Sequence, residues 1–282
     1  WGGTFDRAAE GYDAAPLAFF DEAAGALVRA LDLAPGSRVL DAATGTGKVA
    51  AAAARAVGPA GLVVGVDLSE GMLARARANT EGLGVRLVRM DLAAPSLRAR
   101  AFDAATLGFA ISFLPRPVAA VRALGDALRG GGRLGVSTPA HDAFGPPLEV
   151  FRAALAREGF PPPVPPRPAW RAADRPEHLR LVLGRAGFGR VRVVRLELGT
   201  WLDDGEAFWA FLRGSGYRGT VERLPGEVAA RVHERVVSGA ESLRGPRGIL
   251  LPVPTLIATA SRPRTPAGRR AARARARVGG RA

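Results

Sequence analysis

Two glycines and three acidic residues in the first third of the chain have the types and spacing of a nucleoside-binding site. Gly45 and Gly47 lie in the segment VLDAATGTGK, where a short apolar run passes into a run of strong helix formers. Glycines at such a turn let a ligand approach the backbone, and the following helix offers unpaired N–H groups. Asp41, Asp67 and Asp91 lie at the ends of three consecutive apolar runs. If these runs are parallel strands, the three carboxylates meet in the crevice where open α/β sheets bind ligands.

Two other nucleotide-binding patterns fit this turn less well. A P-loop requires G-x-x-x-x-G-K-[ST], but Ala42 occupies the position of its first glycine and the residue after Lys48 is valine, so this pattern is excluded. The dinucleotide pattern G-x-G-x-x-A is met by Gly45, Gly47 and Ala50. This dinucleotide pattern does not explain Asp41 and Asp91, the acids at the ends of the first and third apolar runs. A nicotinamide-dependent enzyme is therefore the less favoured hypothesis.

The elements that must position these residues alternate between strand and helix along the chain. The alternation is typical of a Rossmann-like, doubly wound, mostly parallel α/β sheet, here with seven strands and a helical cap inserted between late strands. The expected strands are 37–43, 61–67, 85–90, 102–110, 132–138, 190–198 and 249–261.

The remaining segments predict helices, loops and a tail around this sheet. Apolar residues at offsets of three and four predict an amphipathic helix over residues 20–31. Three glycines at 130–132 are expected to end the helix that precedes the fifth strand. We expect one domain over 1–261, with N-terminal lid helices in 1–34, and a basic disordered tail at 262–282. Two cap insertions are expected within the domain, at 141–175 and 199–248. The first is a proline-rich loop, and the second contains a helical stretch at 205–243.

The composition excludes several kinds of chemistry. The chain has no cysteine, so thiolate catalysis and disulfides are excluded. Its three histidines are far apart in sequence, and we expect no metal site. No apolar run approaches the roughly 20 residues that a membrane span needs. The N-terminal sequence does not resemble a secretory signal, and we expect a cytoplasmic protein without a membrane partner.

The net charge of +14 is concentrated at the C-terminus. Residues 262–282 contain eight arginines and no acid, which leaves +6 for the preceding residues. Lys48 is the single lysine among 40 basic residues, a bias that indicates a GC-rich coding sequence. The tail has no aromatic side chain on which a base could stack. A nucleic-acid partner is therefore the less favoured reading of the charge.

Four segments, in order, resemble motifs of the class I S-adenosylmethionine-dependent methyltransferases. LDAATGTG is similar to their first motif, D-x-G-x-G-x-G, with Ala43 in place of the first glycine. GVDLSEGML and RMDLAAPSL resemble the second and third motifs. TFDRAAEGYD resembles the opening of the ubiquinone and menaquinone biosynthesis methyltransferases, where an N-terminal segment folds over the donor. The resemblance covers roughly residues 4–140.

The resemblance implies a role for individual residues in binding S-adenosyl-L-methionine. It implies that Asp41, Gly45 and Gly47 hold the methionine end of this donor, beside Ala43. It also implies that Asp67 and the neighbouring Leu68 meet the ribose. It further implies that Met72 packs on adenine and that Asp91 and Leu92 contact the adenine edge. Finally, it implies that Phe109 completes the methionine pocket and that Tyr12 closes the lid.

A sulfonium donor requires few catalytic groups from the protein, because its methyl group is already activated. A general base is needed only where the acceptor must lose a proton, and His141, just after the fifth expected strand, is the candidate. Five aromatic residues between 201 and 217 form either the core of the cap or a pocket for a flat acceptor.

The expected function is methyl transfer to a small, largely apolar metabolite such as a quinone or a polyketide. Methylation of RNA or protein is one alternative, and a non-methylating protein of the same fold, such as a cyclase, is another. We expect the Asp67 carboxylate to be open to the crevice. Its removal should then weaken donor binding while leaving the melting temperature of the ligand-free protein nearly unchanged.

Overall fold

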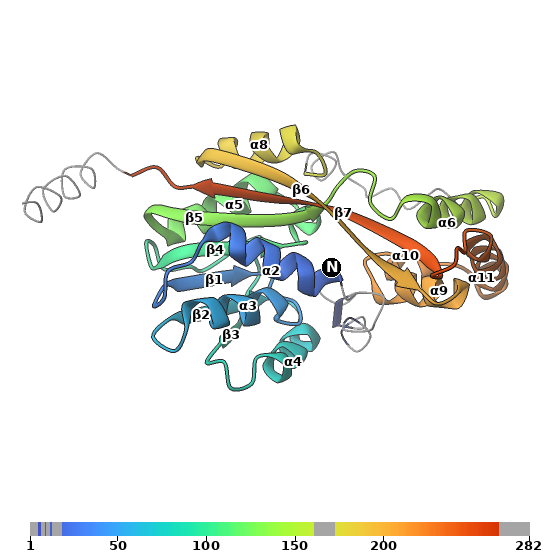
Figure 1. Ribbon diagram of the computed structural model, residues 1–282, viewed down its shortest axis with the longest axis horizontal. Helices are drawn as coiled ribbons and strands as arrows, with labels where there is room; N and C mark the ends of the chain where they lie inside the picture. Colours follow the sequence, from blue (N-terminus) through green and yellow to red (C-terminus); the bar gives the residue numbers. More distant parts are fainter. Residues whose placement is uncertain (1–4, 7–8, 10–11, 13–18, 161–172, 265–282) are drawn as a thin grey trace, which may run out of the picture.

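The computed structural model describes residues 5–6, 9, 12, 19–160 and 173–264. Its centre is a seven-stranded sheet with the strand order β3-β2-β1-β4-β5-β7-β6 (Figure 1). The strands are β1 (Arg38–Ala42), β2 (Leu62–Asp67), β3 (Arg86–Arg89), β4 (Phe102–Gly108), β5 (Leu128–Pro139), β6 (Gly189–Leu202) and β7 (Ile249–Ser261).

The strand directions confirm the expected fold class. β1 pairs in parallel with both β2 and β4, β2 with β3, and β4 with β5, whereas β7 is antiparallel to both β5 and β6. The strand order reverses between β1 and β4. In open α/β sheets the carboxyl ends of the strands at such a reversal form a ligand crevice.

Helices cover both faces of the sheet. On one face, Val28 and Ala53 are buried against Val39 of β1. On the other face, Leu124 and Leu183 belong to a second buried cluster. The helices concerned are α2 (Phe19–Leu31) and α3 (Lys48–Val57) on the first face, α5 (Pro117–Ala127) and α8 (Pro176–Arg185) on the second, and α4 (Glu70–Asn79) beside β3.

Helix α2 confirms the expected amphipathic helix, and its apolar side belongs to the core. Its side chains Leu27 and Leu31 are fully buried. A Cβ atom at Gly135 of β5 would lie only 2.9 Å from Leu27 and 3.0 Å from Leu31. Glycine at this position therefore lets α2 pack directly on the sheet.

The cap lies at one end of the molecule, carried by the extended ends of β6 and β7 (Figure 1). Three of its helices are inserted between these two strands, as expected. Its core is formed by Phe151, Phe208 and Phe211, which are almost fully buried. The cap helices are α6 (Gly145–Arg157), α9 (Gly205–Gly214), α10 (Arg218–Val221) and α11 (Gly226–Glu241).

Three sequence-based expectations are wrong in detail. The predicted loop 141–175 contains helix α6, whose buried Leu148, Phe151 and Leu155 recur at helical offsets that the proline-rich flank obscured. The glycines at 130–132 lie inside β5 rather than ending a helix, because the β4–β5 register shifts there. Arg262 belongs to the fold, since its backbone pairs with Gly132 and its guanidinium with Asp126.

No helix in the described ranges combines the length and the apolar character that crossing a membrane would require. Residues 265–282, which carry most of the predicted tail, lie outside the described residues.

Candidate active site

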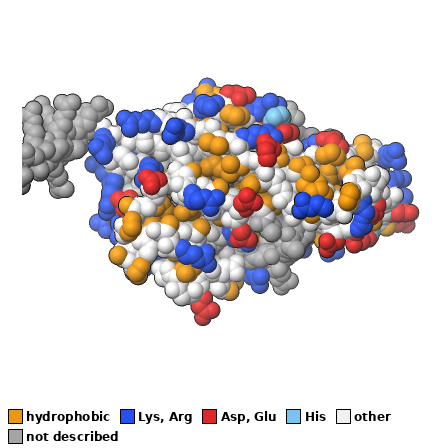
Figure 2. Space-filling view, viewed as in Figure 1, with side chains coloured by type: hydrophobic (Ala, Val, Ile, Leu, Met, Phe, Trp, Pro, Cys, Tyr) orange, Lys and Arg blue, Asp and Glu red, His pale blue; other side chains and the backbone are white. Residues whose placement is uncertain are grey.

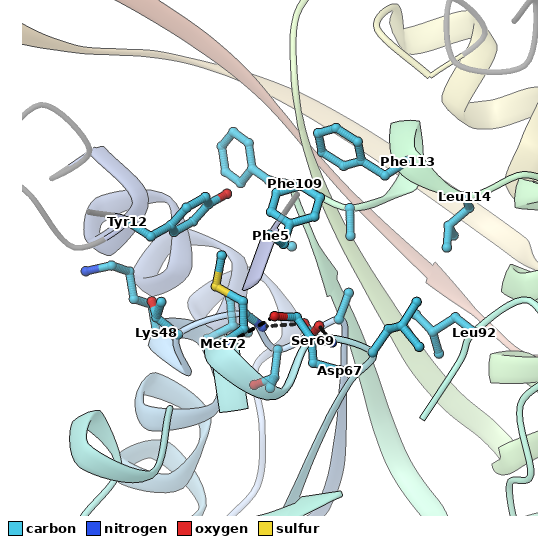
Figure 3. A pocket seen from close by; sticks show the side chains of 18 of the residues that line it. Phe5, Tyr12, Lys48, Asp67, Ser69, Met72, Leu92, Phe109, Phe113 and Leu114 are labelled. Carbon is cyan, nitrogen blue, oxygen red and sulfur yellow. Dashed lines mark hydrogen bonds between the residues drawn. The ribbon is translucent and has the colours of Figure 1, made fainter. Parts of the chain in front are cut away.

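A cavity of about 290 Å³ lies at the carboxyl ends of the first strands (Figure 3). Its volume is close to the lower end of the range for small-ligand sites, about 300 Å³. It is lined by the turn after β1, the turn after β2, the segment after β3 and the turn after β4. This is the crevice that the strand order predicts.

The turn after β1 has a backbone that mostly suits glycine. Ala43, Gly45 and Gly47 have φ angles of 52°, 55° and 86°. Ala43 and Gly45 line the cavity, whereas Gly47 does not. A Cβ atom at Gly47 would lie 3.0 Å from Thr80, so this glycine lets α3 pack against α4. Gly47 therefore has a packing role, and its contact with the donor stays a prediction.

Asp41 also lies beneath the cavity rather than in its wall. The side chain is 1% exposed and does not line the cavity. Its two oxygens accept hydrogen bonds from the hydroxyls of Thr44 (2.6 Å) and Thr106 (2.7 Å). Burial raises the pKa of Asp41 to about 6 despite these bonds. Asp41 thus lies behind Thr44, which does line the cavity, and its contact with the donor stays a prediction.

Asp67 closes β2 and faces the cavity. Its Oδ2 accepts the N–H of Gly45 at 2.8 Å, and its Oδ1 accepts the N–H of Ser69 at 2.9 Å. Burial raises the pKa of Asp67, while these backbone donors act in the opposite direction. Each carboxylate oxygen has about two acceptor positions. The backbone N–H of Leu68 also lowers the pKa of this carboxylate. The carboxylate borders the cavity and can still accept from the hydroxyls of a ligand.

The N-terminus of α4 forms the next part of the wall. Ser69 is its N-cap, and the side-chain oxygen accepts the N–H of Met72 at 3.1 Å. The same hydroxyl donates to Asp6 of the N-terminal segment at 2.5 Å. Met72 is 2% exposed to solvent and lines the cavity, as does Leu68. This places apolar side chains beside the Asp67 carboxylate.

The segment after β3 brings Asp91 and Leu92 to the wall of the cavity. Asp91 Oδ1 accepts the N–H of Ala93 at 2.8 Å, a bond that shapes the local turn. Leu92 is 7% exposed and belongs to the core cluster of the second sheet face. Both residues thus line the cavity, and their contact with the adenine edge stays a prediction.

Five aromatic rings form one wall of the cavity. Phe109 follows β4 with a φ angle of 50°, and its ring meets Phe20 edge-on at 4.8 Å. Tyr12 stacks on Phe20 at 5.4 Å, and Phe5 meets Phe113 edge-on at 5.2 Å. All five side chains line the cavity. The N-terminal segment, α2 and the turn after β4 therefore share this wall.

The aromatic wall reaches the cap through Phe113. This residue ends the short helix η3 (Ile111–Phe113) after β4. A Cβ atom at Gly216, in the turn between α9 and α10, would lie 3.2 Å from the Phe113 ring. Phe20, Phe109 and Tyr12 also pack against the apolar core of the cap. The cap thus closes over the side of the cavity that the rings form.

His141 does not line the cavity. Its side chain is 43% exposed, and Nδ1 lies 3.7 Å from Asp142. Asp142 is in turn bound by Arg195 at 2.8 Å and 2.9 Å. The sequence-based prediction of a general base at His141 is corrected accordingly, because the imidazole belongs to a surface charge cluster.

Of the sequence-predicted donor residues, nine line the cavity and only Asp41 and Gly47 do not. Sequence reasoning missed Lys48, although it is the next residue after the glycine turn. It also missed Phe5, Phe20 and Phe113, which carry no local pattern that separates them from core residues. The nine residues are Tyr12, Ala43, Gly45, Asp67, Leu68, Met72, Asp91, Leu92 and Phe109.

Comparison with known proteins supports what the fold and the cavity indicate. Residues 39–132 match the family described as "Methyltransferase domain". The nocamycin O-methyltransferase of Saccharothrix syringae is 38% identical over 138 residues, which cover 48% of this chain and 49% of that protein. The aklanonic acid methyltransferase DauC of a Streptomyces strain is 35% identical over 138 residues, covering 48% and 63%.

A demethylmenaquinone methyltransferase of Staphylococcus aureus is 32% identical over 122 residues, which cover 43% of this chain and 49% of that protein. The matched part of the chain thus spans about half to two thirds of the length of these relatives. Among solved structures, the YcgJ protein of Bacillus subtilis has a TM-score of 0.55 at 15% identity and covers 86% of this chain and 99% of that one. The [4+2]-cyclase SpnF has a TM-score of 0.53 at 20% identity, covering 87% and 81%. These two structures share the fold.

In its fold, its ordered motifs and the match over residues 39–132, this chain is similar to the class I S-adenosylmethionine-dependent methyltransferases. Within that class it resembles the group that includes the menaquinone and natural-product methyltransferases.

Proposed function

We propose that this chain transfers a methyl group from S-adenosyl-L-methionine to a small, largely apolar acceptor such as a quinone or a polyketide. The observation that carries this proposal is one cavity with carboxylates at the strand ends on one side and five aromatic rings on the other. The carboxylates suit a nucleoside, and the rings suit a flat acceptor. The names of the matched relatives support a natural-product-like acceptor.

The residues around the cavity fit the donor. Backbone N–H groups use some of the acceptor positions of the Asp67 carboxylate. Its remaining positions would accept hydrogen bonds from both ribose hydroxyls. Met72 and Leu92 provide the apolar surface that an adenine ring needs. Ala43 and Gly45 would lie beside the methionine end, at the positive end of α3.

A bound sulfonium donor supplies a methyl group that is already activated by its charge. The part of this chain is to hold the acceptor atom in line at about 3 Å and to exclude water, which can contribute several kcal/mol. Phe20, Phe109 and Phe113 are placed to do both. No histidine is among the described residues of the cavity wall.

Titration with S-adenosylhomocysteine tests the donor assignment directly. We expect measurable heat and a rise in melting temperature, because a ligand that binds only the folded protein stabilises it. Neither effect at millimolar ligand would contradict the proposal. Turnover of labelled donor with acidic and neutral acceptors then tests the reaction. Binding without turnover would favour a non-methylating protein such as a cyclase.

Methylation of RNA or protein is the second candidate, motivated by the net charge of +14. On the face seen in Figure 2, basic side chains are interspersed with acidic ones and form no continuous stripe. Several arginines are paired with acids, among them Arg129 with Asp103 and Arg262 with Asp126. This distribution supports the small-molecule acceptor.

Deleting residues 265–282 separates the two candidates. The cut leaves Arg262 and its bonds to Gly132 and Asp126 in place. We expect methyl transfer to a small acceptor to keep its kcat/KM and its salt dependence after the deletion. Binding of an uncharged small acceptor releases few counterions, so the basic tail would not contribute to it. The measurement is activity over a series of salt concentrations. A large loss of activity at low salt would instead indicate a polyanionic substrate.

A further inference from the structure

Ser137 brings to the cavity wall a hydroxyl group that makes no hydrogen bond within the described part of the chain. It lies near the end of β5, lines the cavity and is 1% exposed. The hydroxyls of Thr44 and Ser69, also in the wall, donate to Asp41 and Asp6. Buried polar groups are normally hydrogen-bonded. The bare hydroxyl of Ser137 therefore points to a partner that enters the cavity.

The Ser137 hydroxyl is open to the cavity rather than sealed in the core. Among the described residues, only Arg262 has a fully enclosed side-chain nitrogen or oxygen without a partner, so the Oγ of Ser137 stays accessible. Gly108, which also lines the cavity, pairs with Ser137 between β4 and β5. A Cβ atom at Gly108 would lie 3.7 Å from this Oγ. Glycine at this position thus leaves the space beside the hydroxyl free.

The Ser137 side chain lies on the face of the sheet that α2 covers. Residues two apart on a strand share a face, and Gly135 of the same strand packs under Leu27 of α2. Phe20 and Ala24, earlier in α2, line the cavity. The hydroxyl is therefore on the side of the sheet where α2 forms the cavity wall.

The position of β5 in the sheet puts this hydroxyl with the aromatic rings. The strand order β3-β2-β1-β4-β5 places β5 three spacings from β2, about 14 Å at roughly 4.8 Å per spacing. Asp67 closes β2, whereas Phe109 follows β4 and its N–H donates to the carbonyl of Ser137 at 2.9 Å. Figure 3 shows Phe109 and Phe113 across the cavity from Asp67. Ser137 thus lies far from the carboxylate that suits a ribose.

We propose that Ser137 binds an oxygen atom of the methyl acceptor and so selects flat acceptors with a carbonyl or hydroxyl group at that edge. The inference rests on the proposed function and adds a specificity-determining residue to it. A hydroxyl can donate one hydrogen bond and accept two, so it can serve either oxygen group. Apolar contacts with the rings are non-directional, whereas one hydrogen bond fixes the orientation of the acceptor.

The test uses two flat probes, p-cresol and toluene, which differ only by a hydroxyl group. Their affinities for wild type and Ser137→Ala are measured by nuclear magnetic resonance titration with saturating S-adenosylhomocysteine. We expect Ser137→Ala to weaken p-cresol about fivefold, which corresponds to about 1 kcal/mol, the contribution of one hydrogen bond. Toluene should bind both proteins nearly equally.

Thr138→Val is the matched control. Thr138 is the next residue of β5 and is 2% exposed, but it does not line the cavity. This variant should bind p-cresol as wild type does. The melting temperature of ligand-free Ser137→Ala should not fall, because no hydrogen bond within the described residues is lost. A marked fall would indicate a structural role and overturn the assignment.

Equal weakening of both probes by Ser137→Ala, weakening of neither, or binding of neither probe to wild type at millimolar concentration would also overturn it. So would a loss of S-adenosylhomocysteine affinity in Ser137→Ala, because the hydroxyl would then belong to the donor. Failure of wild type to bind S-adenosylhomocysteine is measured in a separate titration without a probe. That result would instead overturn the proposed function.

Discussion

Replacing Asp67 by alanine is expected to weaken binding of S-adenosylhomocysteine by at least about tenfold, or 1.4 kcal/mol. In the proposed binding mode, the substitution removes the acceptor for two ribose hydroxyls, and each charge-assisted hydrogen bond contributes roughly 1.5–3 kcal/mol. Calorimetric titration of the purified variant measures the loss. Asp67→Asn, which keeps one carbonyl oxygen, should fall between wild type and Asp67→Ala.

The structure adds a stability effect that the sequence-based expectation did not contain. The Asp67 carboxylate accepts the N–H groups of Gly45 and Ser69, so it joins the turn after β1 to the turn after β2. Leaving these donors without their partner should cost about 1–3 kcal/mol of the free energy of unfolding. We therefore expect a lower melting temperature for ligand-free Asp67→Ala. The sequence alone predicted a nearly unchanged melting temperature, because it placed the carboxylate open to the crevice.

A matched control is Asp126→Ala in helix α5. Asp126 pairs with Arg262 and does not line the cavity. This variant should bind S-adenosylhomocysteine as wild type does. If Asp67→Ala also bound the ligand with wild-type affinity, the assignment of the crevice to the donor ribose would be wrong.

Replacing Asp41 by asparagine is expected to alter the pH dependence of stability. In the folded protein, burial raises the pKa of Asp41 from 3.8 to about 6. Between these values the folded state binds more protons than the unfolded state, so stability falls as pH rises. This group should therefore remove roughly 2 kcal/mol of unfolding free energy between about pH 4 and about pH 7, whereas an amide cannot ionise.

The measurement is urea unfolding of wild type and Asp41→Asn at several pH values. The difference between the two proteins isolates this group from the other carboxylates. Wild type should lose stability relative to the variant as pH rises, with the change complete above about pH 7, one unit above the raised pKa. Parallel stability profiles for the two proteins would contradict a raised pKa at Asp41. Thr106→Val offers a second check, because it removes one of the hydroxyls that lower this pKa.

Much of the cavity wall at the strand ends could be predicted from the sequence, because it depends on local rules. Short apolar runs that alternate with helix formers predict parallel strands, and parallel strands place their carboxyl ends at one edge. Asp67, Asp91 and Gly45 each follow or close such a run, so their meeting required only the fold class. The same rules predicted α2 and the insertion of helices between β6 and β7.

Other features depended on packing between segments far apart in the chain, which no local pattern records. Gly216 approaches Phe113 across about a hundred residues, and Phe5 reaches the same ring from the N-terminal segment. Asp41 resembles a ligand in sequence, yet it is buried beneath the turn because Thr106 of β4 supplies a hydroxyl partner there. His141 follows a strand as a catalytic residue would, but Arg195 of β6 holds its neighbour Asp142 at the surface.

The sequence by itself thus determined the order of strands and helices and which strand ends carry acids and glycines. These properties follow from periodicity and backbone preferences within a few residues. Only the tertiary structure decided which of those acids face the cavity, which aromatic rings close it and which hydroxyl opens into it. Those outcomes depend on burial and on hydrogen-bond partners that come from other elements of the fold.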